Sequence, residues 1–258
     1  MNQLNIYYDI DHITIDLKYF FIIILDTMKT VKYFNFSPFL DNNISAIISK
    51  KNQNLTEKSR VDGIKYFGKK FKLDHQNIAI PVQTHSSNCK IIDNYGIFQN
   101  TDGIITKNKN ITLSLSIADC CPVFVYDKKL KTRGLIHSGW KGTVDKICIN
   151  AIDKFLELKS SLIDLKIYVG PSIQFCCFEV DNDVGDLFYE NCKIRKRNKK
   201  FHVNLQKQIM IDLMSIGLKE HQINASEICT FENNDCESYR REKENSGRML
   251  ALFGEFTI

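Results

Sequence analysis

Three residues that commonly bind transition metals each lie at the end of a short apolar run. His85 follows one run, Cys120 follows a second, and His137 closes a third. Runs of this length, rich in Ile, Val, Thr and aromatic residues, are typical of buried strands. We therefore expect strands whose ends converge at one rim of a sheet and bring two imidazoles and a thiolate together.

The remaining patterns predict a mixture of strands and helices. Runs typical of strands cover residues 78–82, 111–117, 123–126, 134–137, 166–169 and 249–253. Apolar residues at helical spacing predict a helix through 144–155, starting at Gly142 with Thr143 as its N-cap, and another over 205–216 that ends at Gly217. A weaker helical pattern covers 55–67. Because strands and helices do not alternate strictly, the sequence predicts an α+β fold with mixed sheets.

Length and composition favour one soluble domain. The chain has 258 residues, of which 43% are hydrophobic, and only 4 Pro and 12 Gly, so a long linker is not expected. The most apolar stretch, residues 19–25, is far shorter than the ~20 residues of a membrane span and is typical of a buried strand. Residues 1–28 are a candidate N-terminal extension to a domain over 29–258.

The nine cysteines do not suggest a disulfide framework. No pair has the spacing CxxC, two pairs are adjacent, and no cleavable signal peptide begins the chain. A cytoplasmic protein with reduced thiols is the expectation.

The net charge of +5 comes from one segment. Six Lys and Arg between residues 193 and 200 exceed this net charge, so the rest of the chain is close to neutral. Such a run is either a phosphate or nucleic-acid patch or a solvated loop. The sequence contains no motif of the usual DNA- or RNA-binding modules, so we expect the solvated loop and no nucleic-acid partner.

Two imidazoles and a thiolate form a natural ligand set for zinc. Three protein ligands, His85, Cys120 and His137, leave a fourth position for water, as in catalytic zinc sites. Copper is the alternative metal, but a blue-copper site usually has a weak axial Met, and no Met lies between Met28 and Met210. Six His are also too few for a site of several copper ions.

Several polar residues have both a functional and a structural interpretation. Asp119 ends an apolar run, where a charge is costly unless it is hydrogen-bonded or takes part in chemistry. Trp140, the single Trp, either packs a tight turn or forms a pocket wall. Arg60 and Arg241 suit a phosphate because a guanidinium binds bidentately, but a solvated helix face or a surface turn would also explain them. A helix that begins at Thr143 would present an anion-binding end.

The order of short motifs resembles one known family. The segments are Gln-Thr-His at 83–85, Thr-Asp-Gly at 101–103, Ala-Asp-Cys-Cys-Pro-Val at 118–123, His-Ser-Gly-Trp-Lys-Gly-Thr at 137–143, Gly-Pro-Ser-Ile at 170–173, Cys-Phe-Glu-Val at 177–180, Cys-Thr at 229–230, Ser-Tyr-Arg-Arg at 238–241 and Gly-Arg at 247–248. In this order they resemble the multicopper polyphenol oxidoreductase, or laccase-domain, family. The resemblance extends from about residue 59 to the C-terminus.

The resemblance implies a fold and an activity. It implies an α/β sandwich, here mixed sheets flanked by helices, and a zinc ion held by His85, Cys120 and His137. It implies phosphorolysis of adenosine or inosine, and of methylthioadenosine as a further substrate, together with deamination of adenosine. Arg60 would help to hold phosphate or nucleoside.

Site roles follow from that activity as hypotheses. Asp119 would move the proton in deamination, beside Cys120 as the other catalytic residue. Arg60 and the helix end at Thr143 would hold phosphate, and Trp140 and Arg241 would contact substrate. A purine nucleoside and phosphate are then the partners, while the oligomeric state is not indicated.

Two other functions remain open. Cys120 and His137 could form the nucleophile and base of a metal-free cysteine hydrolase acting on an amide, including the editing of a cell-wall precursor that the resemblance also permits. A zinc ion that only braces the fold would need four protein ligands. Cys121 is available by sequence, but neighbouring strand residues point to opposite faces.

Overall fold

The described part of the chain is one folded unit that starts at Tyr33. The computed structural model describes residues 32–51, 63, 70–73 and 75–258, and the unit extends from Tyr33 to Ile258. The candidate N-terminal extension at 1–28 and Arg60 lie outside the described residues. So does the predicted helix over 55–67, apart from Gly63.

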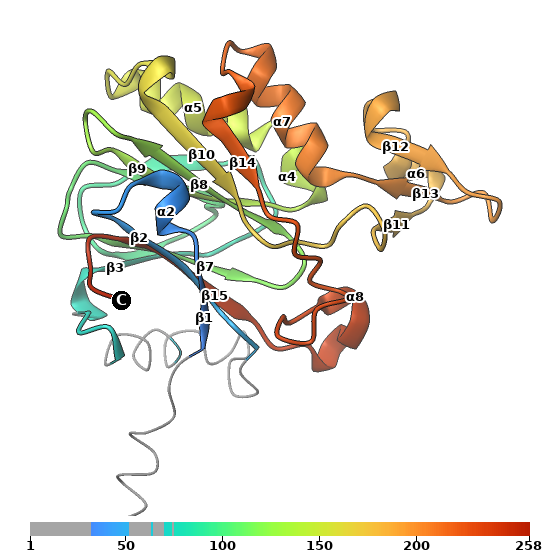
Figure 1. Cartoon of the computed structure of the whole chain (residues 1–258), viewed down its shortest axis with the longest axis horizontal. Coiled ribbons are helices and arrows are strands. Elements are labelled where there is room, and N and C mark those ends of the chain that lie inside the picture. The colour runs from blue at the N-terminus through green and yellow to red at the C-terminus, as the bar shows by residue number, and fades with distance from the viewer. Residues whose placement is uncertain (1–31, 52–62, 64–69, 74) are drawn as a thin grey trace, which may run out of the picture. The chain divides into compact units, whose positions relative to one another are not determined.

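Within the described residues, the strands form two six-stranded sheets and one small sheet (Figure 1). The first sheet has the order β1 (Tyr33–Asn35), β2 (Ser45–Ser49), β15 (Met249–Gly254), β7 (Thr112–Ile117), β3 (Ile78–Pro81) and β5 (Gly96–Phe98). The second has the order β14 (Ile223–Ala225), β10 (Leu165–Val169), β8 (Cys121–Asp127), β9 (Arg133–Ser138), β6 (Gly103–Thr106) and β4 (Cys89–Ile91). The small sheet contains β11 (Glu179–Val180), β13 (Phe201–Val203) and β12 (Lys193–Arg195).

Both large sheets are mixed, which confirms the predicted fold class. Strand β3 pairs parallel to β5 and β7, β10 to β14, and β4 to β6, whereas the other neighbours in these two sheets pair antiparallel. The predicted strands at 78–82, 111–117, 123–126, 134–137, 166–169 and 249–253 correspond to β3, β7, β8, β9, β10 and β15.

Strand β8 shows why the molecule has two cores. All seven of its residues are buried. Phe124 and Tyr126 pack into a core shared with the first sheet, while Val123 and Val125 pack into a core shared with helices. Because successive side chains of a strand point to opposite faces, a strand covered on both faces is apolar along its whole length.

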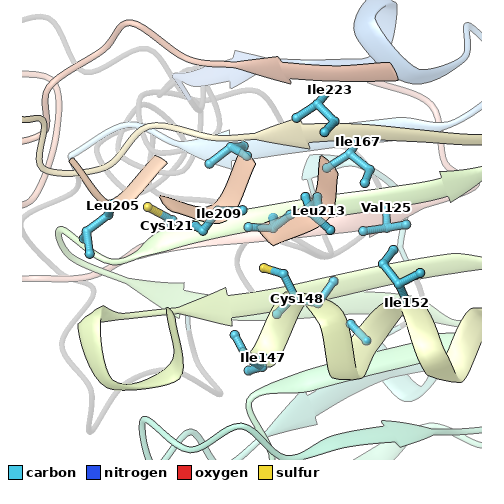
Figure 2. Close-up of a cluster of buried hydrophobic side chains, with 14 of the residues drawn as sticks. Cys121, Val125, Ile147, Cys148, Ile152, Ile167, Leu205, Ile209, Leu213 and Ile223 are labelled. Atoms are coloured by element: carbon cyan, nitrogen blue, oxygen red, sulfur yellow. The ribbon is translucent and has the colours of Figure 1, made fainter. Parts of the chain in front are cut away.

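Helices cover the outer face of the second sheet. The longer helices are α5 (Ile147–Glu157) and α7 (Leu205–Ser215), and the shorter ones are α2 (Ser37–Leu40), α4 (Trp140–Val144), α6 (Asn182–Gly185) and α8 (Tyr239–Glu242). Short 3-10 turns are η2 (His75–Asn77), η3 (Leu162–Asp164), η4 (Glu190–Cys192), η5 (Glu220–Gln222) and η6 (Lys243–Asn245). Figure 2 shows apolar side chains of α5 and α7 meeting those of β8 and β10. The result is a sandwich of two sheets with a helical layer on one side.

The predicted helix through 144–155 is two helices. Lys146 adopts a left-handed conformation with φ 61°, which separates α4 from α5. Gly139, not Thr143, is the N-cap of α4. The Thr143 hydroxyl instead donates to the Gly139 carbonyl at 2.9 Å and lies 2.8 Å from the Ser138 hydroxyl. The apolar spacing continues across the break, so periodicity alone could not show it.

The first part of the basic run, residues 193–195, is a strand and not the expected loop, whereas residues 196–200 form a largely exposed turn, as expected. The run covers β12 and the turn into β13. Lys193 is buried and its Nζ lies 2.8 Å from the Glu190 carboxylate, while the Arg195 guanidinium stacks over the Phe201 ring at 5.5 Å. Lys200 lies 3.4 Å from Asp181. Local acids and a ring therefore partner much of this charge.

None of the helices in the described part of the chain has both the length and the apolar character that a membrane span requires.

Phe155 is the position where we expect the largest cost from a core truncation. It is fully buried on α5, and its ring fills the space above Gly134 of β9, where a Cβ would lie 2.7 Å from the ring. Phe155→Ala would leave a cavity that the rigid sheet cannot close, so it should lower the free energy of unfolding by about 3–5 kcal/mol. Urea denaturation measures this loss; a change below about 1 kcal/mol would contradict the packing described.

Candidate functional site

The three predicted metal ligands converge. His85 lies in the loop after β3, Cys120 immediately precedes β8, and His137 lies on β9. Their ligand atoms all lie within 4.8 Å of one another. The two imidazole rings are 4.9 Å apart, centroid to centroid, at 74°. Pairing of β8 with β9 places Cys121 opposite Ser138 and Pro122 opposite His137, so that Cys120, two residues before Pro122, lies diagonally across from His137.

Asp102 organises two of these ligands. Its carboxylate is fully buried, and Oδ1 lies 2.8 Å from Nδ1 of His137 and accepts a hydrogen bond from the His85 backbone N–H at 3.1 Å. Oδ2 accepts hydrogen bonds from Ser86 and Thr84. Burial would raise the pKa of this carboxyl, but the hydrogen bonds from His137, Ser86 and Thr84 hold it well below its usual range. The Asp102–His137 contact directs Nε2 of His137 toward Cys120, as is typical of metal-binding histidines.

The Cys120 thiol is activated by its neighbours. Burial alone would raise its pKa, but the facing imidazoles of His137 and His85 outweigh this effect and lower the pKa to about 6. Burial likewise works against the His137 imidazolium, yet the Cys120 thiolate and Asp102 raise its pKa to about 9. Between these values the protein without metal would hold a thiolate–imidazolium pair.

Backbone strain surrounds the ligand set. His85 has φ 59° and Asp119 has φ 81°, conformations that cost roughly 1–3 kcal/mol in non-glycine residues. Asp102 compensates at His85, and at Asp119 the carboxylate accepts hydrogen bonds from the Thr230 hydroxyl and the Arg240 backbone N–H, both at 2.6 Å. Gly139 closes the other side: a Cβ there would lie 2.9 Å from the Cys120 sulfur. These contacts fix the positions of the ligand residues.

The ligands open onto a pocket of about 380 Å³. Its apolar and aromatic lining consists of Ala118, Trp140, Ile173, Phe178 and Tyr239, and its lysine and arginine lining consists of Arg240, Lys243 and Arg248. A larger groove of about 740 Å³ lies between residues 70–73 and 255–258, but its described lining includes no His or Cys. Metal ligands, flat rings and cations meet only in the smaller of these two cavities.

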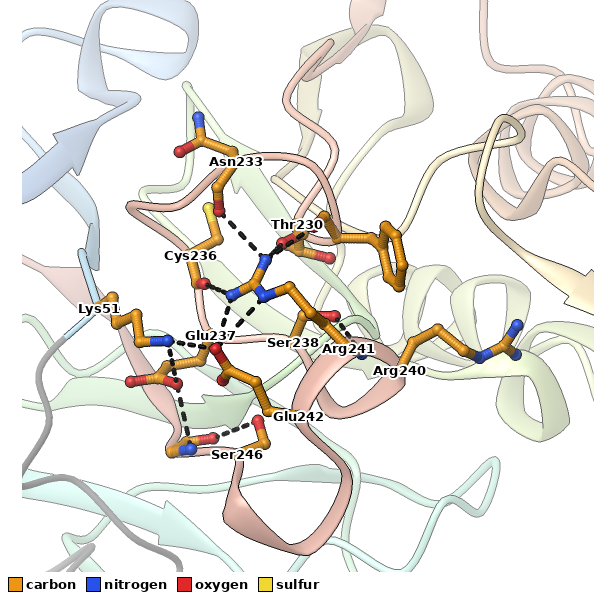
Figure 3. A network of polar contacts seen from close by, with 12 residues as sticks. Lys51, Thr230, Asn233, Cys236, Glu237, Ser238, Arg240, Arg241, Glu242 and Ser246 are labelled. Carbon is orange, nitrogen blue, oxygen red and sulfur yellow. Dashed lines mark hydrogen bonds and ion pairs between the residues drawn. The ribbon is translucent and has the colours of Figure 1, made fainter.

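Of the described residues predicted to contact substrate, one lines the pocket and two do not. Trp140 lines the pocket, as predicted. Thr143 is buried in its turn and is not among the lining residues. Figure 3 shows the Arg241 guanidinium enclosed by backbone carbonyls: it donates to Thr230, Phe231 and Cys236, and also to Glu242. Thr143 and Arg241 therefore make their polar contacts within the protein and are not among the residues that line this pocket, and their contact with substrate stays a prediction.

Arg240, the neighbour of Arg241, lines the pocket. Its side chain points away from the Arg241 network in Figure 3 and its guanidinium stacks over the Phe178 ring at 5.3 Å. It also donates a hydrogen bond to the Glu179 carbonyl at 2.7 Å. Neighbouring residues on the short helix α8 face different ways, and sequence could not choose between two adjacent arginines.

Asp119 lies on the pocket wall, next to Cys120. Its side chain is 8% exposed, and each carboxylate oxygen already accepts one hydrogen bond, from Thr230 or from Arg240. The charge at the end of the apolar run is therefore stabilised by hydrogen bonds. Its role in proton transfer stays a prediction.

Other site residues were missed. Asp102 belongs to a recognised motif but was given no role; a buried charge beside the apolar strand β6 was the available signal. Phe178 and Arg248 likewise lie within motifs, whereas nothing in the sequence distinguished Lys243.

The site offers three protein ligands. In the described residues, the group around His85 contains only Cys120 and His137 besides it. Cys121 is fully buried in the helix-facing core, and burial raises its pKa to about 12. A closed site that uses Cys121 is thus excluded by the alternation of strand β8.

Comparison with known proteins identifies the family. A sequence model described as multi-copper polyphenol oxidoreductase laccase matches residues 42–254. The chain belongs to this family. Among curated relatives, a purine nucleoside phosphorylase of Bacteroides thetaiotaomicron is 33% identical over 195 residues, covering 68% of this chain and 72% of the relative. A purine nucleoside phosphorylase of Clostridium acetobutylicum is 29% identical over 237 residues, covering 87% of this chain and 98% of the relative.

Solved structures of this fold agree with the described architecture. A Bacillus licheniformis hypothetical protein, YfiH, has a TM-score of 0.80 at 23% identity and covers 88% of this chain and 97% of its own. YlmD from Geobacillus stearothermophilus has a TM-score of 0.78 at 21% identity, covering 84% of this chain and 93% of its own. The α+β fold predicted from the strand and helix patterns, and the sandwich that the resemblance implies, are confirmed.

The lowered thiol pKa leads to a direct test on metal-free protein. After chelator treatment, alkylation of Cys120 by iodoacetamide should rise through about pH 6 and level off above it, because only the thiolate reacts. Cys89, whose pKa burial raises to about 12, should stay unreactive across this range. Mass spectrometry of each peptide measures both rates. A Cys120 profile that begins to rise only above pH 8 would contradict the thiolate–imidazolium pair.

Proposed function

We propose that this protein is a zinc-dependent purine nucleoside enzyme. The reactions are phosphorolysis of adenosine or inosine, with methylthioadenosine as a further substrate, and deamination of adenosine to inosine. The observation that carries the proposal is that three metal-binding side chains, aromatic rings and cationic side chains line one pocket. The names of the relatives, purine nucleoside phosphorylase, support it.

The donor set fits zinc. Two imidazole nitrogens and a thiolate, already converging within 4.8 Å, match its preferred ligands, and the three-protein-ligand count is that of a catalytic site. Copper is less well matched, because no Met lines the described pocket. When bound, zinc would supply a Lewis acid.

The pocket chemistry suits a nucleoside and an anion. Trp140, Phe178 and Tyr239 offer aromatic surface to a flat purine, and Arg240, Lys243 and Arg248 offer positive charge to phosphate. In phosphorolysis a phosphate oxygen forms a bond to C1′ of the ribose, and the bond from C1′ to the base nitrogen breaks. The base leaves with a proton, and ribose 1-phosphate is the second product. Arg60 stays a candidate phosphate ligand.

Deamination exchanges the purine amino group for a water oxygen and releases ammonia. We keep Asp119 as the candidate for the proton transfer, because it lines the pocket beside Cys120. Its hydrogen bonds to Thr230 and Arg240 fix the carboxylate in place.

Product analysis tests the proposal. Purified protein is incubated with inosine or adenosine, with and without phosphate, and the bases and sugars are separated by chromatography. Free hypoxanthine and ribose 1-phosphate that form only with phosphate support phosphorolysis, and inosine from adenosine supports deamination. Release of neither product by metal-loaded protein would refute the proposal.

A second candidate is a metal-free cysteine hydrolase, which one observation favours. Cys120, His137 and Asp102 have the contacts of a nucleophile, a base and an orienting carboxylate, with the thiol pKa lowered to about 6. Its substrate would be an amide, of which a cell-wall precursor is one class.

Metal analysis separates the two candidates. About one zinc held by His85, Cys120 and His137, with activity lost on chelation and regained with zinc, supports the nucleoside enzyme. A covalent adduct on Cys120 in chelator-treated and fully active protein supports the hydrolase.

A further inference from the structure

A second group of metal-binding side chains lies outside the site described above. Cys176, Cys177, Cys229 and Glu232 have ligand atoms within 4.8 Å of one another. They come from two loops far apart in sequence, one between β10 and β11 and one after β14. Nothing in the proposed reaction uses them, and the adjacent cysteines of the first loop have no role in it.

Backbone contacts hold the two loops together. Ser172 and Cys229 form an isolated parallel bridge, and the Thr230 N–H donates to the Ser172 carbonyl at 3.1 Å. The Gln174 N–H donates to the Cys229 sulfur at 3.4 Å. The positions of the sulfurs are therefore set by paired backbone and not by one loose segment.

The sulfur separations suit a common ion. The sulfurs of Cys176 and Cys229 are 3.7 Å apart, and those of Cys176 and Cys177 are 3.1 Å apart. Two thiolates on a tetrahedral zinc, with bonds of about 2.3 Å, lie about 3.8 Å apart. The sulfurs of Cys176 and Cys229 already have this spacing. The sulfurs of Cys176 and Cys177 are closer together, and a small rotation of the half-buried Cys177 side chain would bring them to it.

We propose that Cys176, Cys177, Cys229 and Glu232 form a second, structural site for a thiophilic divalent cation of the zinc class. Three thiolates and a carboxylate fill all four positions, which is typical of structural sites, whereas the His85, Cys120 and His137 set leaves one open. Cys176 and Glu232 are exposed, so the ion has a path from solvent, and Cys229 is buried. On binding, the three thiols release their protons to solvent and no redox partner is needed.

This second site would stiffen the pocket of the first. Its first loop carries Ile173 and Phe178, which line that pocket. Its second loop carries Thr230, whose hydroxyl holds the Asp119 carboxylate next to Cys120. A cation that ties the loops together would thus fix an apolar wall and a ligand-bearing turn. The inference does not depend on which reaction the pocket catalyses.

Metal counting on the full chain tests the proposal. Reduced protein is saturated with zinc and dialysed, and the number of zinc ions per chain is then measured by elemental mass spectrometry. We expect two zinc ions in the unaltered protein, one in Cys120→Ala, one in Cys176→Ser and one in Cys229→Ser. Cobalt loaded into Cys120→Ala should show strong thiolate charge-transfer absorption. Adding Cys176→Ser to this variant should weaken that absorption.

Matched variants keep the test decisive. Cys229 is buried, so Cys176→Ser and Glu232→Gln at exposed positions replace it if Cys229→Ser does not fold. Each removes a proposed ligand and should leave one zinc ion after dialysis. Cys89→Ser, a half-buried thiol outside both groups, should keep two zinc ions. Zinc should also slow hydrogen exchange in residues 172–178 and 226–232 of Cys120→Ala.

Three results would overturn the proposal. One is a single zinc ion in the unaltered protein that disappears in Cys120→Ala. Another is an unchanged zinc content in Cys176→Ser. The third is a disulfide among Cys176, Cys177 and Cys229 in zinc-saturated protein, because oxidised sulfurs cannot bind the ion as thiolates.

Discussion

Cys120→Ala is expected to abolish both metal binding at the pocket and nucleoside turnover. The substitution removes the one anionic ligand of the set and leaves two neutral imidazoles, His85 and His137. Loss of the metal forfeits several kcal/mol of transition-state stabilisation; about 4 kcal/mol corresponds to a roughly 1,000-fold fall in kcat/KM. Metal analysis and chromatographic assays with adenosine and inosine measure the two losses.

A matched variant controls for the loss of a thiol. Cys89→Ala removes a half-buried sulfur that donates only a weak hydrogen bond to the Ile147 carbonyl, at 3.7 Å, and it should keep metal and activity. Circular dichroism and denaturation establish that Cys120→Ala is folded. Normal turnover of adenosine by folded Cys120→Ala would refute the assignment of Cys120 as a ligand.

Asp102→Asn is expected to weaken both folding and metal binding at the pocket, although Asp102 does not line the pocket. The carboxylate accepts hydrogen bonds from His85, Ser86 and Thr84 and contacts Nδ1 of His137, so an amide would turn an NH₂ group toward one of these donors. The mismatch should cost about 1–3 kcal/mol of unfolding free energy. Loss of the carboxylate behind His137 should weaken metal binding by about 10–100-fold.

Asp102 is a positioning residue, and its test must separate metal affinity from folding. Competition with a chromophoric chelator gives the zinc affinity, and urea denaturation gives the stability. Asp153→Asn, an exposed acid on α5, is the control and should change stability by less than about 0.5 kcal/mol. If Asp102→Asn bound zinc as tightly as the unaltered protein, the orienting role would be wrong.

Local patterns predicted the secondary structure where the buried residues of an element follow a regular spacing. Strand β8 is largely apolar because both of its faces are covered, strand β7 alternates Leu or Ile with Ser or Thr, and α7 has a regular apolar stripe that ends before Gly217. Prediction failed where the backbone leaves its regular path. The left-handed Lys146 splits a helix without disturbing its apolar spacing. The basic run begins with strand β12, which pairs with β13, and Glu190 and the Phe201 ring contact its first charges.

In the site, too, local motifs predicted some features and missed others. His85, Cys120 and His137 were predicted from motifs at strand ends, and the structure brings them together. Arg241 and Thr143 were predicted as substrate contacts, but the polar atoms of both are engaged by the protein. Which neighbour points into a pocket depends on the direction of each side chain, and that direction is set by packing.

The sequence by itself determined the kinds of chemistry available to this protein: the ligand types, their order, the mixed fold and the family. Those properties depend on residue identity and local periodicity, which can be read from the sequence without knowing any long-range contact. Only the tertiary structure decided that Asp102 supports both imidazoles, that Arg240 instead of Arg241 reaches the pocket, and that Cys176, Cys177 and Cys229 meet. Each of these depends on segments distant along the chain, whose approach is governed by the packing of two sheets and a helical layer.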